Sequence, residues 1–544
     1  MPQMNSTRIA ELLVRKGVSQ AFGIIGSSNA WLFDAFKKVG IVVTGLHHEQ
    51  ACVMAASGYY KTTRKPAVVI VAAGGGATNA VTGVAGLWAD STPGMILSGQ
   101  ETSGNLENDK LKRMYGMQGV KGHEIVKSIT KFSCVFEKLQ DVETAWGIMT
   151  TGRFGPVWLD IPMDLQTRMT NDHVVPYEIS GEALTWDFDI DKYERPVILA
   201  GQGVKLSRSE DVLATIHVPV VTSWSAIDVY HPLNFGCPGI YGNRCANKIV
   251  QACDLLIVLG SRLSYMQTGY DFSKFAPNAT IIMVNVEPFD FKGSVNVQLD
   301  CKVVIDQLAT KKFDIDPWID ECKQLSIKCP KLEMTHENNG TWLNSYKFIH
   351  DQLSPLLSNE VVVTDMGTAL LSGHNTIRLK PENTMFSSYG LGEMGYGLPA
   401  SVGAAVSGRR VVCLNCDGSM MMNLQELQTI AAHKLNVKVI IFKNDGYLSI
   451  KHTQKMFKCE HTAVDGSTGV KLPNYTKVFQ SFDIPVFSEH AENIRYFEAF
   501  EEFMRVDGPA MYEVFMDPYQ NFSPKVQATK VGDVIIPGTL DNMV

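Results

Sequence analysis

Two buried apolar runs, each followed directly by a polar turn, constrain the fold of this chain more than any other feature. Residues 410–415 lead into Asp417, and residues 437–442 lead into Asn444. A predicted helix over 423–430 separates the two runs, so this stretch is expected to form two parallel strands joined by one β-α-β crossover. The two polar side chains would then lie together at the carboxyl edge of one sheet.

An Asp carboxylate and an Asn amide oxygen are hard oxygen ligands, which suit a magnesium ion that also binds a diphosphate. Gly418 and Gly446 would let the backbone approach the phosphates, and helix N-termini would offer N–H donors to them. Either Asp-Gly or Asn-Asp-Gly alone could be an ordinary turn. Because both follow matching strand ends, we favour a metal-diphosphate site.

Apolar runs of strand length alternate with helical stretches along the chain, which predicts an α/β fold with three doubly wound parallel-sheet domains. Ligands bind such sheets at the carboxyl ends of the strands. Asn5-Ser6-Thr7 is expected to cap a first helix. The end of the chain is expected to be an irregular surface segment. The predicted parts are a first domain over 1–170, a linker over 171–190, a central domain over 191–325, a linker over 326–345, a third domain over 346–525 and a tail over 526–544.

The composition argues against several classes of partner. The chain has 544 residues, 45% of them hydrophobic, and its 49 basic and 56 acidic residues give a net charge of −7 without any basic block. We therefore expect no nucleic-acid partner. No apolar run reaches the ~18 residues of a membrane span, and no signal peptide is evident. Eleven cysteines, an odd number scattered along the chain, favour a reducing, cytoplasmic location.

Three further motifs occur in a specific order along the chain. They are His48-Glu49-Gln50 followed by Ala55-Ala56-Ser57-Gly58-Tyr59, then Gly76-Ala77-Thr78-Asn79, and then Gly390-Leu391-Gly392-Glu393-Met394-Gly395-Tyr396-Gly397-Leu398-Pro399-Ala400. Together with the element from 417 to 444, they resemble the thiamine diphosphate-dependent decarboxylases and carboligases, most closely the acetolactate-synthase-like branch. The resemblance covers residues 5 to 520 and implies thiamine diphosphate and Mg²⁺ as cofactors.

The resemblance assigns roles at the third domain. Asp417 and Asn444 would ligate Mg²⁺ through their side chains and Gly446 through its carbonyl. Gly367 and Thr368 would contact the diphosphate, and Gly418, Ser419 and Tyr447 are also implied to bind the cofactor. Cys416 and Lys443 depart from the Gly and Asn that the family usually carries there, but both lie outside the implied ligand positions.

The cofactor's reactive end would be held by the other motifs. Gly392 and Met394 would bond the aminopyrimidine through backbone groups, and the Met394 side chain would keep the cofactor folded. The carboxyl group of Glu49 would bond the pyrimidine ring nitrogen and so promote removal of the thiazolium proton by the cofactor's own amino group. Without the other motifs, Glu49 would read as a surface acid that follows two histidines.

Three polar residues are weaker candidates for the catalytic group. His48 is a candidate proton relay near the substrate, as is His47, although a structural hydrogen-bonding role is the alternative for both. Gln118 matches a family position near the bound donor substrate, and a plain loop glutamine is its alternative.

The family forms its site between subunits, which implies a homodimer or homotetramer.

The central domain bears on a second cofactor and on the substrate. Gly201-Gln202-Gly203, Gly239-Ile240-Tyr241-Gly242 and Gly260-Ser261-Arg262 resemble flavin-contacting segments of acetolactate synthases, so FAD and a contact from Arg262 are expectations that the short fragments leave open. Those synthases carry an arginine that holds an acceptor 2-keto acid where this chain has Met266. Losing such a charge-assisted bond, worth about 1.5–3 kcal/mol, disfavours a keto-acid acceptor.

The sequence therefore predicts a carboligase that decarboxylates pyruvate, or a related 2-keto acid, and transfers the two-carbon unit to an aldehyde or ketone. The segment after Asn444 resembles relatives that act on nucleotide-linked keto-sugars. Acetolactate synthesis and simple 2-keto-acid decarboxylation are the alternatives. A catalytically silent subunit that only binds the cofactor is a further alternative, and it predicts that a motif is broken. This chain keeps the acid Glu49, the metal pair of Asp417 and Asn444, and Met394, which argues against that alternative.

Overall fold

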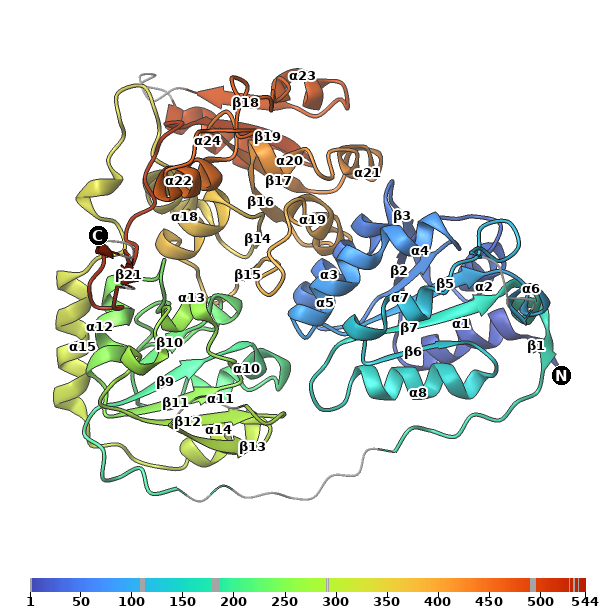
Figure 1. The fold of residues 1–544 in the computed structure, drawn as a ribbon, viewed down its shortest axis with the longest axis horizontal. Coiled ribbons are helices and arrows are strands. Elements are labelled where there is room, and N and C mark those ends of the chain that lie inside the picture. Colours follow the sequence, from blue (N-terminus) through green and yellow to red (C-terminus); the bar gives the residue numbers. More distant parts are fainter. Residues whose placement is uncertain are drawn as a thin grey trace.

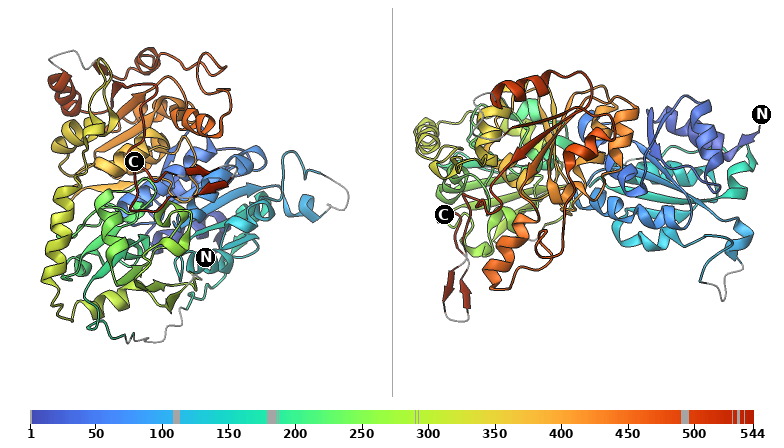
Figure 2. Two further views of the ribbon diagram at one scale, coloured as in Figure 1. Left: turned by 60° about the vertical axis from the view of Figure 1, so that its left-hand side comes forward. Right: turned by 90° about the horizontal axis from the view of Figure 1, so that it is seen from above.

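The computed structural model describes residues 2–107, 113–178, 186, 188–289, 291, 293–489, 496–527, 529–531, 534–536 and 538–544. Three units lie around a common junction, with the first domain on the right of Figure 1 and the other two stacked on the left. Seen from above, the first domain again lies to the right of the other two (Figure 2). Part of the predicted linker, residues 179–185 and 187, lies outside the described residues. None of the described helices has the length and apolar character needed to cross a membrane.

The first domain contains a six-stranded sheet in the order β3-β2-β4-β5-β7-β6, with every pair parallel. The short strands β1 (Gln3–Met4) and β8 (Met169–Thr170) pair antiparallel beside it. The strands are β2 (Gln20–Gly23), β3 (Val42–Gly45), β4 (Val68–Val71), β5 (Gly94–Gln100), β6 (Phe132–Val135) and β7 (Pro156–Pro162). The helices are α1 (Asn5–Arg15), α2 (Ala30–Lys38), α3 (Glu49–Thr63), α4 (Gly75–Asn79), α5 (Val81–Ala89), α6 (Ser103–Glu107), α7 (Gly122–Ile125), α8 (Leu139–Met149) and α9 (Met163–Thr167).

The central domain has a five-stranded parallel sheet in the order β10-β9-β11-β12-β13. Its strands are β9 (Pro196–Ala200), β10 (Val220–Thr222), β11 (Leu255–Leu259), β12 (Thr280–Asn285) and β13 (Ser294–Gln298). Its helices are α10 (Gln202–Leu206), α11 (Glu210–Leu213), α12 (Arg244–Ala252), α13 (Tyr265–Thr268), α14 (Cys301–Leu308) and α15 (Asp316–Lys328). The buried residues of β9 and β11 form the centre of one apolar core.

The third domain has a six-stranded parallel sheet in the order β15-β14-β16-β17-β19-β18. Its strands are β14 (Val361–Thr364), β15 (Thr384–Phe386), β16 (Val411–Cys416), β17 (Val437–Lys443), β18 (Val486–Glu489) and β19 (Ala510–Phe515). Its helices are α16 (Ser345–Lys347), α17 (Ser354–Leu356), α18 (Thr368–Thr376), α19 (Gly397–Ala405), α20 (Asp417–Met420), α21 (Glu426–Ala432), α22 (Leu448–Phe457), α23 (Tyr475–Gln480) and α24 (Tyr496–Arg505). The three sheets confirm the predicted fold class.

One core joins the first and third domains. It contains alternate residues of both sheets, including Val69 and Val71 from β4 and Val411 and Cys413 from β16. The helices α3 and α19 cross at the centre of this core, where α19 approaches the backbone of α3 (Figure 1). A Cβ atom added at Gly403 would lie 1.8 Å from the carbonyl oxygen of Ala55, so only glycine permits this crossing.

The structure corrects several local predictions. The apolar runs of the sequence do not predict β6, β13, β15 and β18, which are short strands at the edges of the three sheets. The helix predicted over 423–430 occupies 426–432 instead. Asn5 does not cap α1, because it lies inside the helix and its side-chain Nδ2 donates to the carbonyl of Leu165.

The predicted irregular surface tail is also wrong in part. Val526 donates its N–H to the Ile240 carbonyl at 2.8 Å, and Val526, Leu540 and Met543 are buried in the core of the central domain. Between them β20 (Thr529–Val531) pairs antiparallel with β21 (Val534–Ile536). The spaced apolar residues of the tail therefore pack into the central domain and connect the third domain to it.

Candidate functional site

The predicted metal ligands lie side by side at the carboxyl edge of the third sheet. Asp417 follows β16 and Asn444 follows the neighbouring parallel strand β17. The Oδ2 atom of Asp417 accepts the N–H groups of Asn444 at 2.8 Å and Asp445 at 2.6 Å, and Oδ1 accepts the N–H of Gly418 at 2.8 Å. These bonds fix the Asp417 carboxylate against the backbone of the turn that begins at Asn444.

The buried atoms of this pair fit a cation. The Oδ1 atom of Asn444 is buried and has no hydrogen-bond partner among the described residues, which is costly unless a ligand satisfies it. Burial raises the pKa of Asp417 to about 7, although the three N–H groups lower it. A positive ion beside Asp417 would hold the carboxylate in its charged form. Among the described residues, no three His, Cys, Asp or Glu side chains gather as a metal cluster, so an amide and a backbone oxygen would have to complete this site.

Glycine is required on both sides of the pair. Gly446 has a φ of +146°, and a Cβ atom there would lie 2.1 Å from the Val464 carbonyl oxygen. A Cβ atom on Gly418 would lie 2.6 Å from the ring of Tyr447. Ser419 is buried, and its hydroxyl donates to Asn415 Oδ1 at 2.8 Å. The predicted cofactor-binding residues Gly418, Ser419 and Tyr447 therefore lie beside Asp417 and Asn444.

The start of α18 faces the same edge. Gly367, with a φ of +90°, precedes the helix and Thr368 begins it. The Sγ atom of Cys416 accepts the N–H of Ala369 at 3.3 Å, which gives the unusual cysteine a local structural role. Gly367, Thr368 and the metal pair are thus brought together as predicted from three consecutive strand ends.

The loop that precedes α19 carries Gly392 and Met394. Gly392 has a φ of +73°, and the side chain of Met394 is 39% exposed, available to a ligand or a partner. Sequence reasoning missed the residue that holds this loop. The buried carboxylate of Asp365, directly after β14, accepts the N–H groups of Gly395 at 3.0 Å and Gly397 at 2.7 Å. The Asp-x-Gly turn at 365–367 was the available signal.

In the first domain, Glu49 begins α3 and faces the glycine-rich loop. Its Oε2 atom accepts the Nδ2 group of Asn79 at 3.0 Å, and its Oε1 atom lies 3.1 Å from the Cβ position of Gly76. His48 is the N-cap of the helix, where its Nδ1 atom accepts the Gln50 N–H at 3.1 Å. This bond supports the structural alternative for His48.

Gln118 lies against the same loop. Its carbonyl oxygen is 2.4 Å from the Cβ position of Gly74, and its N–H donates to Glu101 Oε1 at 3.2 Å. The side chain of Gln118 is exposed. The backbone N–H of His47 donates to Glu426 Oε1 of the third domain at 3.0 Å. Glu49 and Gln118 are therefore neighbours, but their hydrogen bonds among the described residues stay within the first domain.

A cavity of about 380 Å³ lies between the central domain and the other two. Its lining includes Arg262, Ser261 and Gln202 from the central domain and Arg153 from the first domain. Met266 also lines the cavity and is 37% exposed. The predicted segment 239–242 contributes no residue to this lining. It packs instead against α13 and the third domain, where Asn375 bonds its carbonyls.

Comparison with known proteins agrees with this division of the chain. Residues 5–124 match the N-terminal TPP binding domain of thiamine pyrophosphate enzymes, 189–308 match their central domain, and 365–514 match their C-terminal TPP binding domain. The chain belongs to the thiamine pyrophosphate enzyme family. The predictions of the family and of a thiamine diphosphate-dependent enzyme are confirmed.

Individual relatives are acetolactate synthases of similar length. The chain is 28% identical over 547 residues to acetolactate synthase isozyme 2 large subunit of Escherichia coli, which covers 95% of this chain and 96% of that one. Isozyme 1 of the same organism is 29% identical over 549 residues, with 95% of each chain covered. A probable acetolactate synthase large subunit of Methanocaldococcus jannaschii is 28% identical over 515 residues, with 88% and 86% covered.

Proposed function

We propose that this thiamine diphosphate-dependent enzyme is a carboligase that decarboxylates pyruvate and transfers the two-carbon unit to an aldehyde or ketone. The observation that carries the proposal is that one chain contains both parts of such a site. The third domain holds the buried pair Asp417 and Asn444, whose amide oxygen has no partner among the described residues, and the first domain holds the candidate acid Glu49. Thiamine diphosphate, when bound, supplies a carbon nucleophile that stabilises negative charge after carbon dioxide leaves.

The chain's own residues would bind the metal and the cofactor, orient the aminopyrimidine and hold a proton. Asp417, Asn444 and the Gly446 carbonyl would hold Mg²⁺ and with it the diphosphate. Gly392 and Met394 would position the aminopyrimidine. Glu49, anchored by Asn79 at 3.0 Å, would hold a proton at the pyrimidine ring nitrogen.

A direct test replaces Glu49 with Gln, which keeps the size of the side chain but removes its acid. We expect turnover with pyruvate to fall by about 10²-fold or more, the usual contribution of a positioned acid or base. Glu124→Gln is the matched control, because this glutamate lies in the same domain and is exposed. Near-normal turnover of Glu49→Gln with the cofactor bound would refute the assigned activation.

For the acceptor, we propose a ketone other than a 2-keto acid, such as a nucleotide-linked keto-sugar. The support is Met266, whose apolar side chain lines the central cavity at the position where the resemblance places a carboxylate-binding arginine. Acetolactate synthesis is the second candidate, and the full-length similarity to acetolactate synthases favours it. Incubation with labelled pyruvate alone separates these candidates. Abundant acetolactate would refute the unusual acceptor, and free acetaldehyde would point to simple decarboxylation.

We also propose FAD as the ligand of the central cavity. Two guanidinium groups, Arg153 and Arg262, and the hydroxyl of Ser261 line it and could bind a diphosphate. At about 380 Å³ the cavity holds part of a dinucleotide, and the rest would extend through its open side. A yellow purified protein whose absorbance is lost with Arg262→Ala would support this assignment. A colourless protein that takes up no added FAD would reject it.

The assembly we propose is a homodimer or homotetramer that completes each site with a second subunit. The loop that precedes α19 and carries Gly392 and Met394 is called the cofactor loop. In and around it, four apolar residues are each 39–44% exposed, namely Leu391, Met394, Met421 and Met422, and such a group favours a protein partner. Light scattering of the purified protein should give at least twice the mass of 60.0 kDa calculated for one chain. A cytoplasmic location stays a prediction, supported by eleven unpaired cysteines.

A further inference from the structure

The segment that leads into the cofactor loop runs along the outside of the third domain. It begins with β15, the edge strand of the sheet, and continues through Gly390 toward Met394. An edge strand leaves half of its backbone N–H and C=O groups without a partner in the sheet. Something else must bind the groups of residues 385–390, and here both other domains do so.

The first domain contributes the pair of Lys61 and Asp90. The carboxylate of Asp90 accepts the N–H of Gly390 at 2.7 Å and that of Tyr389 at 3.3 Å. Lys61 Nζ lies 2.6 Å from Asp90 Oδ2 and also donates to the Ser387 carbonyl at 2.7 Å. The side chains of the pair are only 9% and 3% exposed. The pair therefore binds three backbone groups of the segment.

Third-domain rings also surround the Lys61 ammonium group. The ring centroids of Tyr396, Phe386 and Tyr389 lie 5.2, 5.8 and 5.9 Å from Nζ. Burial alone would lower the pKa of Lys61, but the charge and hydrogen bond of Asp90, together with Tyr396, outweigh burial and raise the pKa above its ordinary value. The lysine is thus a buried cation that belongs to one domain and is held by another.

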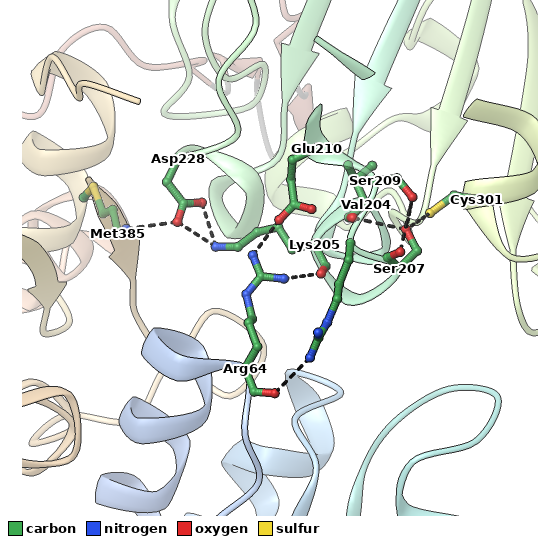
Figure 3. A network of polar contacts seen from close by, with 10 residues as sticks. Arg64, Val204, Lys205, Ser207, Ser209, Glu210, Asp228, Cys301 and Met385 are labelled. Atoms are coloured by element: carbon green, nitrogen blue, oxygen red, sulfur yellow. Dashed lines mark hydrogen bonds and ion pairs between the residues drawn. The ribbon is translucent and has the colours of Figure 1, made fainter. Parts of the chain in front are cut away.

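The central domain contributes an equivalent pair, Lys205 and Asp228 (Figure 3). Lys205 Nζ lies 2.6 Å from Asp228 Oδ1, and the side chains are 11% and 6% exposed. The Oδ2 atom of Asp228 accepts the N–H of Met385 at 3.1 Å. In both pairs a buried lysine neutralises an aspartate whose remaining lone pairs bind backbone N–H groups of the same segment.

The two pairs are connected to each other. Arg64, at the end of α3 one turn beyond Lys61, donates to the Lys205 carbonyl and lies 2.5 Å from Glu210 (Figure 3). The side chain of Gln202 donates to the Asp90 carbonyl at 2.6 Å. The first and central domains thus form one polar frame around residues 385–390.

We propose that Lys61–Asp90 and Lys205–Asp228 are positioning pairs that set the place of the cofactor loop, so that they govern thiamine diphosphate binding without touching the cofactor. The inference rests on the proposed cofactor function of Gly392 and Met394. Asp90 binds Gly390, two residues before Gly392, so a shift of this anchor is transmitted through very little chain. A displacement of about 1 Å at such a site is enough to cost affinity and rate.

The test measures the dissociation constant of thiamine diphosphate by calorimetry, at saturating Mg²⁺, for the full-length protein and its variants. Asp90→Asn and Asp228→Asn keep the size of the side chain but lose its charge and one strong acceptor. We expect each to raise the dissociation constant about 10-fold or more, with Asp90→Asn the stronger because it binds two N–H groups. Lys61→Arg should recover most of the affinity that Lys61→Met loses.

Two further comparisons separate positioning from plain stability. Glu143→Gln is the matched control, since Glu143 makes an ion pair of 2.6 Å with Lys16 and is 3% exposed. Among the residues that the structure describes, its side chain bonds only residues of the first domain and its linker. It should lower the melting temperature and leave the dissociation constant unchanged. The double variant Lys61→Met with Asp90→Asn should bind the cofactor better than Lys61→Met alone, because no unpaired carboxylate remains buried.

The outcomes are distinct. If the wild-type protein binds no thiamine diphosphate, the proposed function fails. If the wild type binds it and Asp90→Asn and Asp228→Asn lower only the melting temperature, as Glu143→Gln does, the pairs are structural and the inference is wrong. Should Asp90→Asn not fold, Asp228→Asn and the comparison of Lys61→Met with Lys61→Arg decide the matter by the same measurement.

Discussion

Glu393 offers a stability prediction that the structure makes quantitative. It lies between Gly392 and Met394, and its Oε1 atom is buried without a hydrogen-bond partner in the part of the chain that the structure describes. Its Oε2 atom accepts the Ser388 hydroxyl at 2.5 Å. Oε1 lies 2.8 Å from the Cβ position of Gly86 on α5, so the carboxyl group is enclosed between the first and third domains.

The free energy follows from the pKa of this carboxyl group. Burial raises the pKa of Glu393 from 4.5 to about 7, against the opposing effect of the Ser388 bond. Because the folded protein binds this proton more tightly than the unfolded chain, the stabilisation is complete below the unfolded pKa and is lost as the pH rises through the folded one. The shift corresponds to about 3 kcal/mol, and to about 2 kcal/mol after a discount for the partly exposed side chain.

Glu393→Gln removes the charge and should therefore stabilise the cofactor-free protein at high pH. We expect its melting temperature to exceed that of the wild type by about 4–8 °C near pH 8, and to match it near pH 5. Thermal unfolding followed by circular dichroism between these pH values measures the difference. Curves that run parallel at every pH would show that Glu393 is not a strained buried acid, and the reasoning would be wrong.

Two other substitutions test the site and the packing. Asp417→Asn should weaken Mg²⁺-dependent binding of thiamine diphosphate by about 100-fold in calorimetry, since it removes the one carboxylate of the metal pair; undiminished binding would exclude Asp417 as a ligand. Gly403→Ala should cost about 3 kcal/mol of unfolding free energy, because its Cβ atom would lie 1.8 Å from Ala55 O. Gly466→Ala, with open space around it, is the control in the same calorimetric scan, and equal melting temperatures would contradict the close helix crossing.

The central part of the fold could be predicted because its signal is local. Buried parallel strands such as β4, β11 and β16 are continuous apolar runs, and the order of strands and helices then limits the topology. Edge strands lack that signal. β13 is Ser-Val-Asn-Val-Gln with exposed positions, and β15 has three residues, so neither reads as a strand without its neighbour.

The candidate site divides in the same way. Asp417 and Asn444 could be placed together from sequence because adjacent parallel strands bring their carboxyl ends to one edge. Lys61, Asp90 and Asp228 could not, since each acts on a backbone group in another domain, and no spacing along the chain records that contact. The cap predicted at Asn5 failed for a similar reason, because a distant carbonyl binds its amide.

These long-range bonds make the cofactor loop a product of domain docking. Within its own domain, Asp365 holds the loop after Met394, and Asp90 and Asp228 from the other domains hold the segment before it. A ligand that requires this position of the loop binds only the protein whose three domains are packed together. Its binding therefore stabilises that packing, by about 2.7 kcal/mol when the ligand concentration is one hundred times its dissociation constant. Because Asp90, Gln202 and Gly390 also line the central cavity, a ligand there and one at the loop share the same junction. Each should therefore raise the affinity for the other, by equal factors.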